Sequence, residues 1–370
     1  MGAGIVGLAH AYVAARAGWK VAVFERNPAA RGASVRNFGM VWPIGQPPGA
    51  LYEMALRSRE IWLALLTEAG LPYLATGSLH VAYREDEAAV GREFAERGGA
   101  LGYACEWLDV GRTLEKTPAI RAEGLIGALW SPLELTVDAR EVIAKIPAFL
   151  TERYGVKFHF HSAVKEVEAR TLRTSECCCQ AGFIVVASGD DFQTLFPEWF
   201  RGLGLTRCKL QMMRTVAQPR NWALGPSLAF GLTFRHYPTF RICDSLAALK
   251  ARVAEETPEL DRWGIHVMAS ENSARQITLG DSHEYGLGVD IFDRVQVNEL
   301  ILHYARAYLR VPDLRIAESW HGVYAKHPEK PFLRMTPVEG VRVVTVTSGI
   351  GMTLSFGLAE QTHRELGIVP

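Results

Sequence analysis

Gly2-Ala3-Gly4-Ile5-Val6-Gly7 begins an alanine-rich stretch that ends at Gly18, and Lys20-Val21-Ala22-Val23-Phe24-Glu25 follows it. The first stretch has the composition of a helix closed by glycine, and the second is typical of a short buried parallel strand. Glycines in G-x-G-x-x-G spacing let the chain turn tightly, approach a pyrophosphate and pack a helix against a strand. Glu25 can accept hydrogen bonds from ribose hydroxyls. This order of elements predicts a dinucleotide site.

The strand that normally precedes the glycines of a dinucleotide-binding unit is not found in this sequence. The fingerprint normally follows a strand, and only Met1 precedes Gly2 in this sequence. A missing central strand would leave backbone groups of its neighbours unpaired. We therefore expect either a start upstream of Met1 or a fold without its first strand, and we favour the first.

Composition excludes several classes of protein. The 370 residues include forty basic and forty acidic side chains, so the formal net charge is zero, which provides no general attraction for nucleic acid or an anionic membrane. We find no apolar run long enough to span a bilayer and no signal-peptide pattern. The six cysteines, three of them consecutive, are too few for a disulfide scaffold and favour free thiols in the cytoplasm. No Cys-x-x-Cys or His-x-x-His pair occurs, so we expect no metal site.

The remaining sequence contains two kinds of segment: some have mixed helix and strand patterns, and one is dominated by strand patterns. Helices are predicted at 51–70, 138–154 (with Asp138 as N-cap), 244–256, 295–310 and 352–365, and strands at 77–83, 156–160, 163–167, 183–188 and 341–347. Between about 208 and 326 the pattern indicates longer alternating strands with few helices. Leu279-Gly280-Asp281-Ser282-His283 is interpreted as a β-turn, because poor helix formers follow it.

Three further segments join the first motif in a recognisable set. They are Ala33-Ser34-Val35-Arg36-Asn37-Phe38-Gly39-Met40, Val185-Val186-Ala187-Ser188-Gly189 and Thr347-Ser348-Gly349-Ile350-Gly351-Met352-Thr353. Together they resemble the FAD-dependent amine and amino-acid oxidoreductases of the D-amino-acid oxidase, glycine oxidase and sarcosine oxidase group. The sequence looks most similar to a branch of that group linked to aminophosphonate breakdown.

The resemblance implies an α/β fold with an α+β second domain. A Rossmann-type FAD-binding domain would comprise residues 1–76, 136–206 and 330–370, and a substrate domain on a mixed or antiparallel sheet would comprise 77–135 and 207–329. The cofactor would be FAD. The residues implied to bind it are Gly2, Gly4, Ile5, Gly7, Glu25, Arg26, Ser34, Arg36, Asn37, Phe38, Gly39, Val164, Ser188, Gly189, Gly349, Gly351, Met352 and Thr353.

The implied reaction oxidises the C–N bond of a small primary or secondary amine, with dioxygen or another electron acceptor as partner. Amino-acid oxidases carry a Gly-x-Arg-Pro strand whose arginine binds the substrate carboxylate as a bidentate fork. Here Tyr324 takes the matching place and Lys326 follows on the same strand face, which suits a phosphonate or similar anion. Arg235 and His236 are further substrate-binding candidates. No catalytic side chain is assigned, because the cofactor carries the chemistry.

Several alternatives stay open from the sequence. A glycine or sarcosine type of amino-acid oxidase could take its arginine from another strand. A non-catalytic dinucleotide-binding protein would fit the missing first strand, and an NAD-binding protein would leave the C-terminal glycine turn without a role. The oligomeric state is not indicated.

Overall fold

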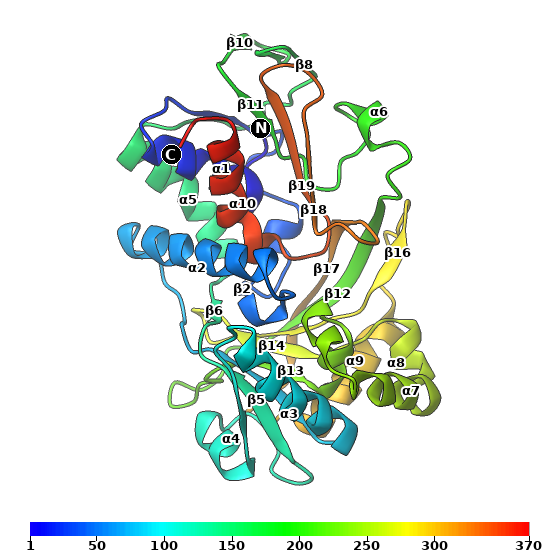
Figure 1. The fold of residues 1–370 in the computed structure, drawn as a ribbon. Coiled ribbons are helices and arrows are strands. Elements are labelled where there is room, and N and C mark those ends of the chain that lie inside the picture. Colours follow the sequence, from blue (N-terminus) through cyan, green and yellow to red (C-terminus); the bar gives the residue numbers. More distant parts are fainter. Residues whose placement is uncertain (370) are drawn as a thin grey trace.

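The computed structural model describes residues 1–369, which form two connected parts (Figure 1). The upper part in Figure 1 holds the N-terminus, the last helix and several small sheets. The lower part is built on one nine-stranded sheet. The chain passes between the two parts several times, so each part is assembled from separate segments.

The first part contains helices around short strands. Its helices are α1 (Ile5–Arg16), η1 (Ala33–Val35), η2 (Pro43–Gly45), α2 (Ala50–Glu68), α5 (Ala139–Tyr154), α6 (Pro197–Phe200) and α10 (Gly351–Glu365). Its strands are β1 (Ala22–Phe24), β2 (Met40–Val41), β6 (Leu135–Thr136), β7 (Lys157–His159), β8 (Glu166–Glu168), β9 (Thr171–Arg173), β10 (Cys178–Gln180), β11 (Ile184–Val186), β18 (Phe332–Met335) and β19 (Val341–Val346).

Two parallel strand pairs form the base of this part. β1 pairs with β7, and β11 pairs with β19. The first two residues connect the pairs: the Gly2 N–H donates to the Phe24 carbonyl at 2.8 Å, and the Ala187 N–H donates to the Met1 carbonyl at 3.0 Å. Met1 and Gly2 therefore lie between the two strand pairs and bond to both, at the position that the first strand of a dinucleotide-binding unit normally occupies.

The last helix completes the core of the first part. α10 packs on α1 and α2, and the Phe356 ring meets Tyr12 and Trp62 edge to face. The Trp62 indole N–H also donates to the Met352 carbonyl at 2.7 Å. These aromatic side chains are fully buried, so the contact between the first and last helices is a substantial source of hydrophobic stabilisation.

The second part covers both faces of its sheet with short helices. Its helices are α3 (Glu85–Ala100), α4 (Val110–Lys116), η3 (Gly231–Arg235), η4 (Pro238–Ile242), α7 (Leu246–Glu256), α8 (Pro258–Arg262) and α9 (Val295–Tyr308). Its strands are β3 (Ser78–Ala82), β4 (Glu106–Leu108), β5 (Gly127–Ser131), β12 (Thr206–Thr215), β13 (Ser227–Phe230), β14 (Met268–Glu271), β15 (Ile277–Gly280), β16 (Glu284–Gly286) and β17 (Ile316–Lys326).

The nine-stranded sheet is mixed, which confirms the predicted fold class. Its order is β16-β12-β15-β14-β13-β3-β5-β4, with β17 paired to β12. Only the β3–β13 pair is parallel among its described strands. The long β12–β17 ladder sets Cys208 opposite Tyr324, so both side chains lie on the same face of the sheet.

The structure differs from the sequence predictions in three segments. The expected strand at 163–167 forms only from Glu166, and Val164 lies in the loop before it. Helix α3 was not predicted, because its many charged and small residues weaken the apolar periodicity. The Leu279–His283 segment was interpreted as a β-turn, and this is wrong: Leu279 and Gly280 end β15, and after three residues β16 continues along the same strand, β12, in the same direction.

The capping interaction of α5 gives a direct test of the fold. The Asp138 carboxylate accepts hydrogen bonds from the N–H groups of Arg140 and Glu141 at 3.0 and 3.3 Å. We expect Asp138→Ala to lower the free energy of unfolding by about 1 kcal/mol, because these helix-end donors lose their acceptor. Urea unfolding followed by circular dichroism measures it, and Glu152→Ala, an exposed change on the same helix, is the control. Equal losses in both variants would contradict the capping role.

Candidate functional site

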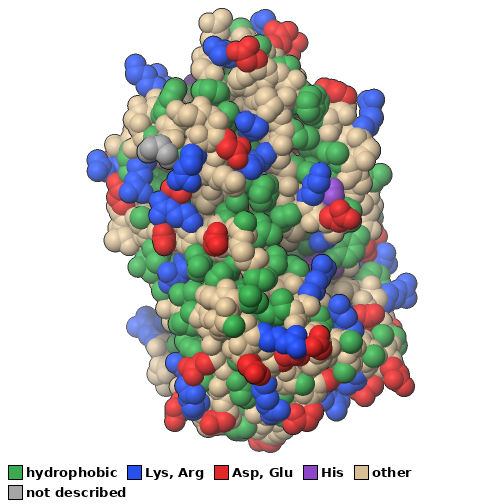
Figure 2. Space-filling model, in the orientation of Figure 1, with side chains coloured by type: hydrophobic (Ala, Val, Ile, Leu, Met, Phe, Trp, Pro, Cys, Tyr) green, Lys and Arg blue, Asp and Glu red, His purple; other side chains and the backbone are tan. Residues whose placement is uncertain are grey.

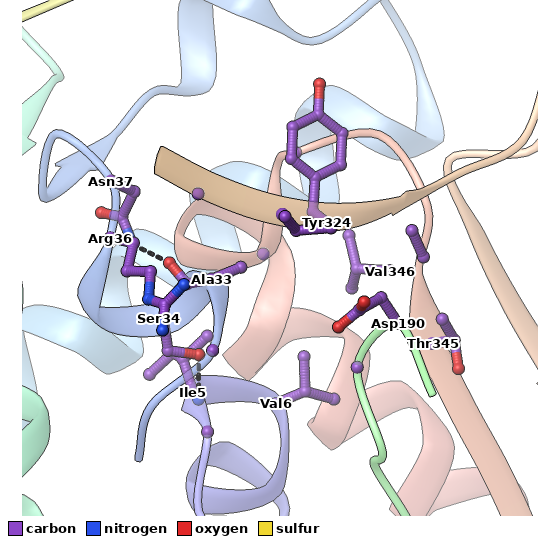
Figure 3. Close-up of a pocket in the computed structure, with 18 of the residues that line it drawn as sticks. Ile5, Val6, Ala33, Ser34, Arg36, Asn37, Asp190, Tyr324, Thr345 and Val346 are labelled. Carbon is purple, nitrogen blue, oxygen red and sulfur yellow. Dashed lines mark hydrogen bonds between the residues drawn. The ribbon is translucent and has the colours of Figure 1, made fainter. Parts of the chain in front are cut away.

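A cavity of about 580 Å³ lies between the two parts and is lined by both. Its first half is formed by the glycine turn before α1, the segment around η1, the loop after β11 and the start of α10. Its second half is formed by β12, β17 and the loops around η3, β14 and β15. Figure 3 shows Ser34, Arg36 and Asn37 on one side of this space, with Tyr324 on the strand across it.

The N-terminus of α1 faces the cavity with little side-chain obstruction. Gly4 is the N-cap residue and contributes no side-chain hydrogen bond, and the first turn carries no acidic residue. A Cβ on Gly4 would lie 3.0 Å from the Ser34 Oγ, and one on Gly7 would lie 1.9 Å from the Gly2 carbonyl oxygen. The absence of a side chain at Gly4 therefore leaves space in the cavity, whereas its absence at Gly7 lets α1 pack closely against the backbone of Gly2. Helix N–H groups and dipole at such an end suit a pyrophosphate.

Glu25 lies at the carboxyl end of β1 and is held in place. Its carboxylate accepts hydrogen bonds from the Ala3 N–H at 2.9 Å and the Asn27 N–H at 3.0 Å. It lines the cavity together with Val164. The loop before β8 lies beside Glu25, because the Ser162 N–H donates to the Glu25 carbonyl at 2.8 Å, so an adenosine moiety could meet both the acid and this loop.

The segment at 33–39 is braced by its own side chains. Ser34 Oγ accepts from the Ile5 N–H at 2.9 Å, which ties the segment to α1 (Figure 3). The Asn37 amide donates to the Ala33 carbonyl at 2.8 Å and accepts from the Gly39 N–H at 2.7 Å. Gly39 has a φ of +74° and lies against the Val137 carbonyl, where a Cβ would be only 1.8 Å from the oxygen.

The N-terminus of α10 also opens on the cavity. Gly349, Gly351, Met352 and Thr353 line it, and Ile350 caps the helix without a side-chain hydrogen bond. Thr353 Oγ accepts from the Trp42 N–H at 3.0 Å, which fixes this end of the helix. The partial positive charge of a helix N-terminus stabilises negative charge that develops beside it.

The loop after β11 closes the cavity edge. Ser188 and Gly189 line the cavity, and the Ser188 hydroxyl donates to the Asp191 carbonyl at 3.1 Å. Asp191 also pairs with Arg26 at 2.6 Å. This ion pair links the loop to the end of β1 but is half exposed, so its contribution to stability is small.

Tyr324 and Lys326 are placed differently, although they share a strand face. Tyr324 lines the cavity next to Gly349, whose Cβ would lie 3.0 Å from the tyrosine Cζ. Burial is the main cause that raises the Tyr324 pKa well above its usual value, so the side chain is a neutral phenol. Lys326 does not line the cavity, and burial lowers its pKa. Its charge nevertheless acts on the cavity, because it helps to lower the pKa values of His236 and His283.

Arg235 and His236 are neighbours with opposite positions. His236 lines the cavity. Arg235 does not: its guanidinium pairs with Asp261 at 2.8 Å and donates to the Ile265 carbonyl at 2.9 Å. The structure therefore gives Arg235 an architectural position behind the cavity wall.

Three cavity residues near His236 escaped the sequence analysis: His266, Asp281 and His283. One ring nitrogen from each of the three histidines lies within 4.8 Å of the others. They come from the end of η3, the loop before β14 and the loop after β15, so no local spacing motif could reveal them. Only the sheet brings the three loops together.

Most of the predicted site residues line the one cavity. These are Gly2, Gly4, Ile5, Glu25, Arg26, Ser34, Arg36, Asn37, Phe38, Val164, Ser188, Gly189, His236, Tyr324, Gly349, Gly351, Met352 and Thr353. Four of the predicted site residues do not line it: Gly7, Gly39, Arg235 and Lys326.

This geometry defines a flavoprotein-like dinucleotide site, and comparison with known proteins agrees. The chain matches the DAO family, described as FAD dependent oxidoreductase, over residues 1–364. The protein belongs to this family. The predicted family and FAD cofactor are thereby confirmed, and the NAD interpretation is set aside.

Individual curated relatives share a low sequence identity with this chain, and they match only about half of it. The chain is 28% identical to glycine oxidase of Geobacillus kaustophilus over 209 residues, 51% of this chain and 53% of that protein. It is 25% identical over 238 residues to D-amino acid dehydrogenase 2 of Mesorhizobium japonicum, 49% of this chain and 57% of that protein. The matched regions thus span about half the length of these curated relatives.

Solved structures share the whole fold. The Geobacillus kaustophilus glycine oxidase structure superposes with a TM-score of 0.77 at 20% identity, covering 99% of this chain and 92% of that one. An iminodiacetate oxidase from a Chelativorans species gives a TM-score of 0.70 at 18% identity, covering 99% and 94%. These similarities establish the fold.

The cavity fits the family's cofactor on its own geometry. Two helix N-termini with glycines at or just before their first turns and the Glu25 carboxylate line one cavity, and these are the features that bind an extended dinucleotide. Among residues 1–369, no helix has both the length and the apolar character needed to cross a membrane.

Proposed function

We propose that this protein oxidises the C–N bond of a small primary or secondary amine that carries an anionic group, with a phosphonate as the favoured anion. Bound FAD would supply the hydride acceptor. The product imine would be hydrolysed by water, and dioxygen or another acceptor would take the electrons. The observation that carries the proposal is that Tyr324 lines the cavity. By the sequence resemblance, this tyrosine takes the place of the carboxylate-binding arginine of amino-acid oxidases.

Four arginines line the cavity, and three of them already have partners; the fourth, Arg31, is exposed and lies just before η1, in the first half of the cavity. Arg207 is held by Asp190 through its Nε at 3.0 Å, and Arg26 is held by Asp191. Arg36 donates to the His321 carbonyl at 3.4 Å and lies beside Ser34, on the pyrophosphate side (Figure 3). A planar carboxylate therefore finds no free bidentate partner among these three, whereas a phenol and a nearby ammonium suit a tetrahedral anion.

The residues of the cavity also favour a neutral amine. Burial lowers the pKa of His283 to about 4 and that of His236 well below its usual value, so both rings are uncharged at neutral pH. Met212, Met268 and Leu210 add apolar walls. A poorly hydrated wall disfavours an ammonium ion, and the neutral amine is the form whose C–H bond can be oxidised.

Substrate oxidation by the purified holoenzyme tests the proposal. We expect anaerobic bleaching of the flavin absorbance by aminoalkylphosphonates and their N-methyl forms, with glycine and alanine much slower. Faster bleaching by glycine or sarcosine would support the amino-acid oxidase alternative, for which the glycine oxidase relative is the main argument. Bleaching by none of these amines would contradict the proposal.

Charge removal at Lys326 separates anion binding from general damage. We expect Lys326→Met to lower kcat/KM for 2-aminoethylphosphonate about 3- to 10-fold, because its ammonium lies outside the cavity and attracts the anion through space and not by direct contact. The value for ethylamine, which lacks the anion, should change little. Lys330→Met, at an exposed position beyond the same strand, is the matched control. Equal loss for both amines, or no loss, would show that Lys326 does not serve the anion.

The cysteines bear on the compartment. All six are free thiols, and Cys208 and Cys243 are buried. We infer that the protein works in the reducing cytoplasm, where thiols persist.

A further inference from the structure

We propose that His236, His266 and His283, with Asp281, form a binding site for a divalent transition-metal ion such as Zn²⁺ in the wall of the cavity. The three imidazoles each offer one nitrogen within 4.8 Å of the others. Their rings are tightly gathered, with centroids 3.9 Å apart for His236 and His266 and 4.4 Å apart for His236 and His283. Imidazole nitrogen and carboxylate oxygen are the ligands that Zn²⁺ takes in proteins.

Buried polar atoms in this cluster lack hydrogen-bond partners. His266 is 2% exposed and Asp281 is 5% exposed. Among the described residues, neither ring nitrogen of His266 has a hydrogen-bond partner. The Asp281 Oδ1 has none either. The His266 Nε2 and Asp281 Oδ1 are 3.2 Å apart but are not aligned for a hydrogen bond. Leaving such groups unpaired in a protein interior is costly, and a bound cation would satisfy them.

His283 is already oriented as a metal ligand. Its Nδ1 lies 3.0 Å from the Gly264 carbonyl oxygen. A carbonyl only accepts, so this nitrogen carries the proton and the Nε2 presents its lone pair. Metal-binding histidines are commonly oriented by a backbone carbonyl in this way.

The chemistry of the donors favours a metal ion. Each histidine offers a ring nitrogen and Asp281 places an oxygen 3.2 Å from the His266 Nε2, so the cluster combines nitrogen and oxygen donors of the kinds that bind transition metals. An ion at this position would have coordination sites open to the cavity and could bind the acidic group of the substrate. That role rests on the proposed function, but the presence of the ion does not.

Metal content of the holoenzyme tests the proposal without any substrate. Purified protein is stripped with a chelator, incubated with Zn²⁺, passed through a desalting column and measured by mass spectrometry. We expect about one Zn²⁺ per chain in the wild type and at least a tenfold weaker affinity by titration calorimetry in His283→Gln and Asp281→Asn. His303→Gln, at an exposed position on α9, should bind as the wild type does.

The flavin absorbance of each variant reports whether it has folded. If a histidine variant loses its flavin, the comparison of Zn²⁺ affinity between the wild type and Asp281→Asn tests the proposal instead. Absence of bound Zn²⁺, Co²⁺ and Ni²⁺ in the wild type, or unchanged affinity in folded site variants, would overturn the proposal. Saturable binding of inorganic phosphate in place of metal would overturn it too, and would identify an anion site. None of these results depends on which amine is oxidised.

Discussion

Gly4→Val is expected to yield colourless protein with less than about a tenth of the wild-type flavin content. The Cβ alone would lie 3.0 Å from the Ser34 Oγ, the atom that accepts a hydrogen bond from the Ile5 N–H. The two methyl groups of valine would then occupy the space through which a pyrophosphate approaches the helix N-terminus. Backbone strain is not the cause, since Gly4 has a φ of −72° that any residue adopts. The ratio of absorbance at 450 nm to that at 280 nm measures the effect.

The control for Gly4→Val is a glycine with free space around it. Gly99 lies exposed in α3, and a Cβ there would meet nothing within 4 Å. Gly99→Ala should keep its full flavin content. Circular dichroism of Gly4→Val should show that the fold is retained, with a lower thermal midpoint because the stabilisation by the cofactor is lost. Yellow Gly4→Val protein with a normal flavin ratio would contradict the assignment of the cradle.

Acid is expected to destabilise the protein well above the pH at which carboxylates titrate. Burial lowers the pKa values of His10 and His80 to about 3, from an ordinary value of 6.5. Between these values the unfolded chain binds protons that the native state does not, so stability falls as pH falls from 6.5. Each histidine costs about 1.4 kcal/mol per pH unit in this range. The two together remove about 5 kcal/mol between pH 6.5 and 4.5, a large share of a typical stability.

His80 offers the test of this acid sensitivity. It is fully buried against Phe234 and Phe240, and neither of its ring nitrogens has a hydrogen-bond partner among the described residues. His80→Leu should reduce the loss between pH 6.5 and 4.5 by about 2 kcal/mol, the share of one such histidine, measured by urea unfolding at each pH. His303→Gln should leave the loss unchanged, because that imidazole is exposed. An acid profile of His80→Leu that parallels the wild type would contradict the prediction.

The sequence predicted the elements that local signals specify. α5 begins after Asp138 as the cap pattern indicates, and β1 and α10 lie within a few residues of their predicted bounds. The glycine turns that line the cavity were found for the same reason, because close approach of a ligand to the backbone demands glycine at fixed spacing. Since these signals are contained in segments of about ten residues, they can be recognised without tertiary information.

The missed features depend on distant segments. His236, His266 and His283 meet only because three loops of the second part converge. Lys326 shares a strand face with Tyr324, yet it stands outside the cavity, because strand alternation fixes the side of the sheet but not the extent of the pocket. Arg235 is adjacent to His236, and its pairing with Asp261 depends on where α8 lies. Chain neighbours can therefore face different surroundings, which spacing arguments do not reveal.

The packing of α10 against α1 and α2 has a consequence for biosynthesis. The helix that closes the core of the first part is made of residues 351–365, so during translation the apolar faces of α1 and α2 wait for nearly the whole chain to be synthesised. Such exposed intermediates are prone to aggregate and to recruit chaperones. Because the cavity is lined by the starts of both α1 and α10, it is complete only when α10 has docked. We therefore expect tight flavin binding to follow the synthesis of residues 351–365.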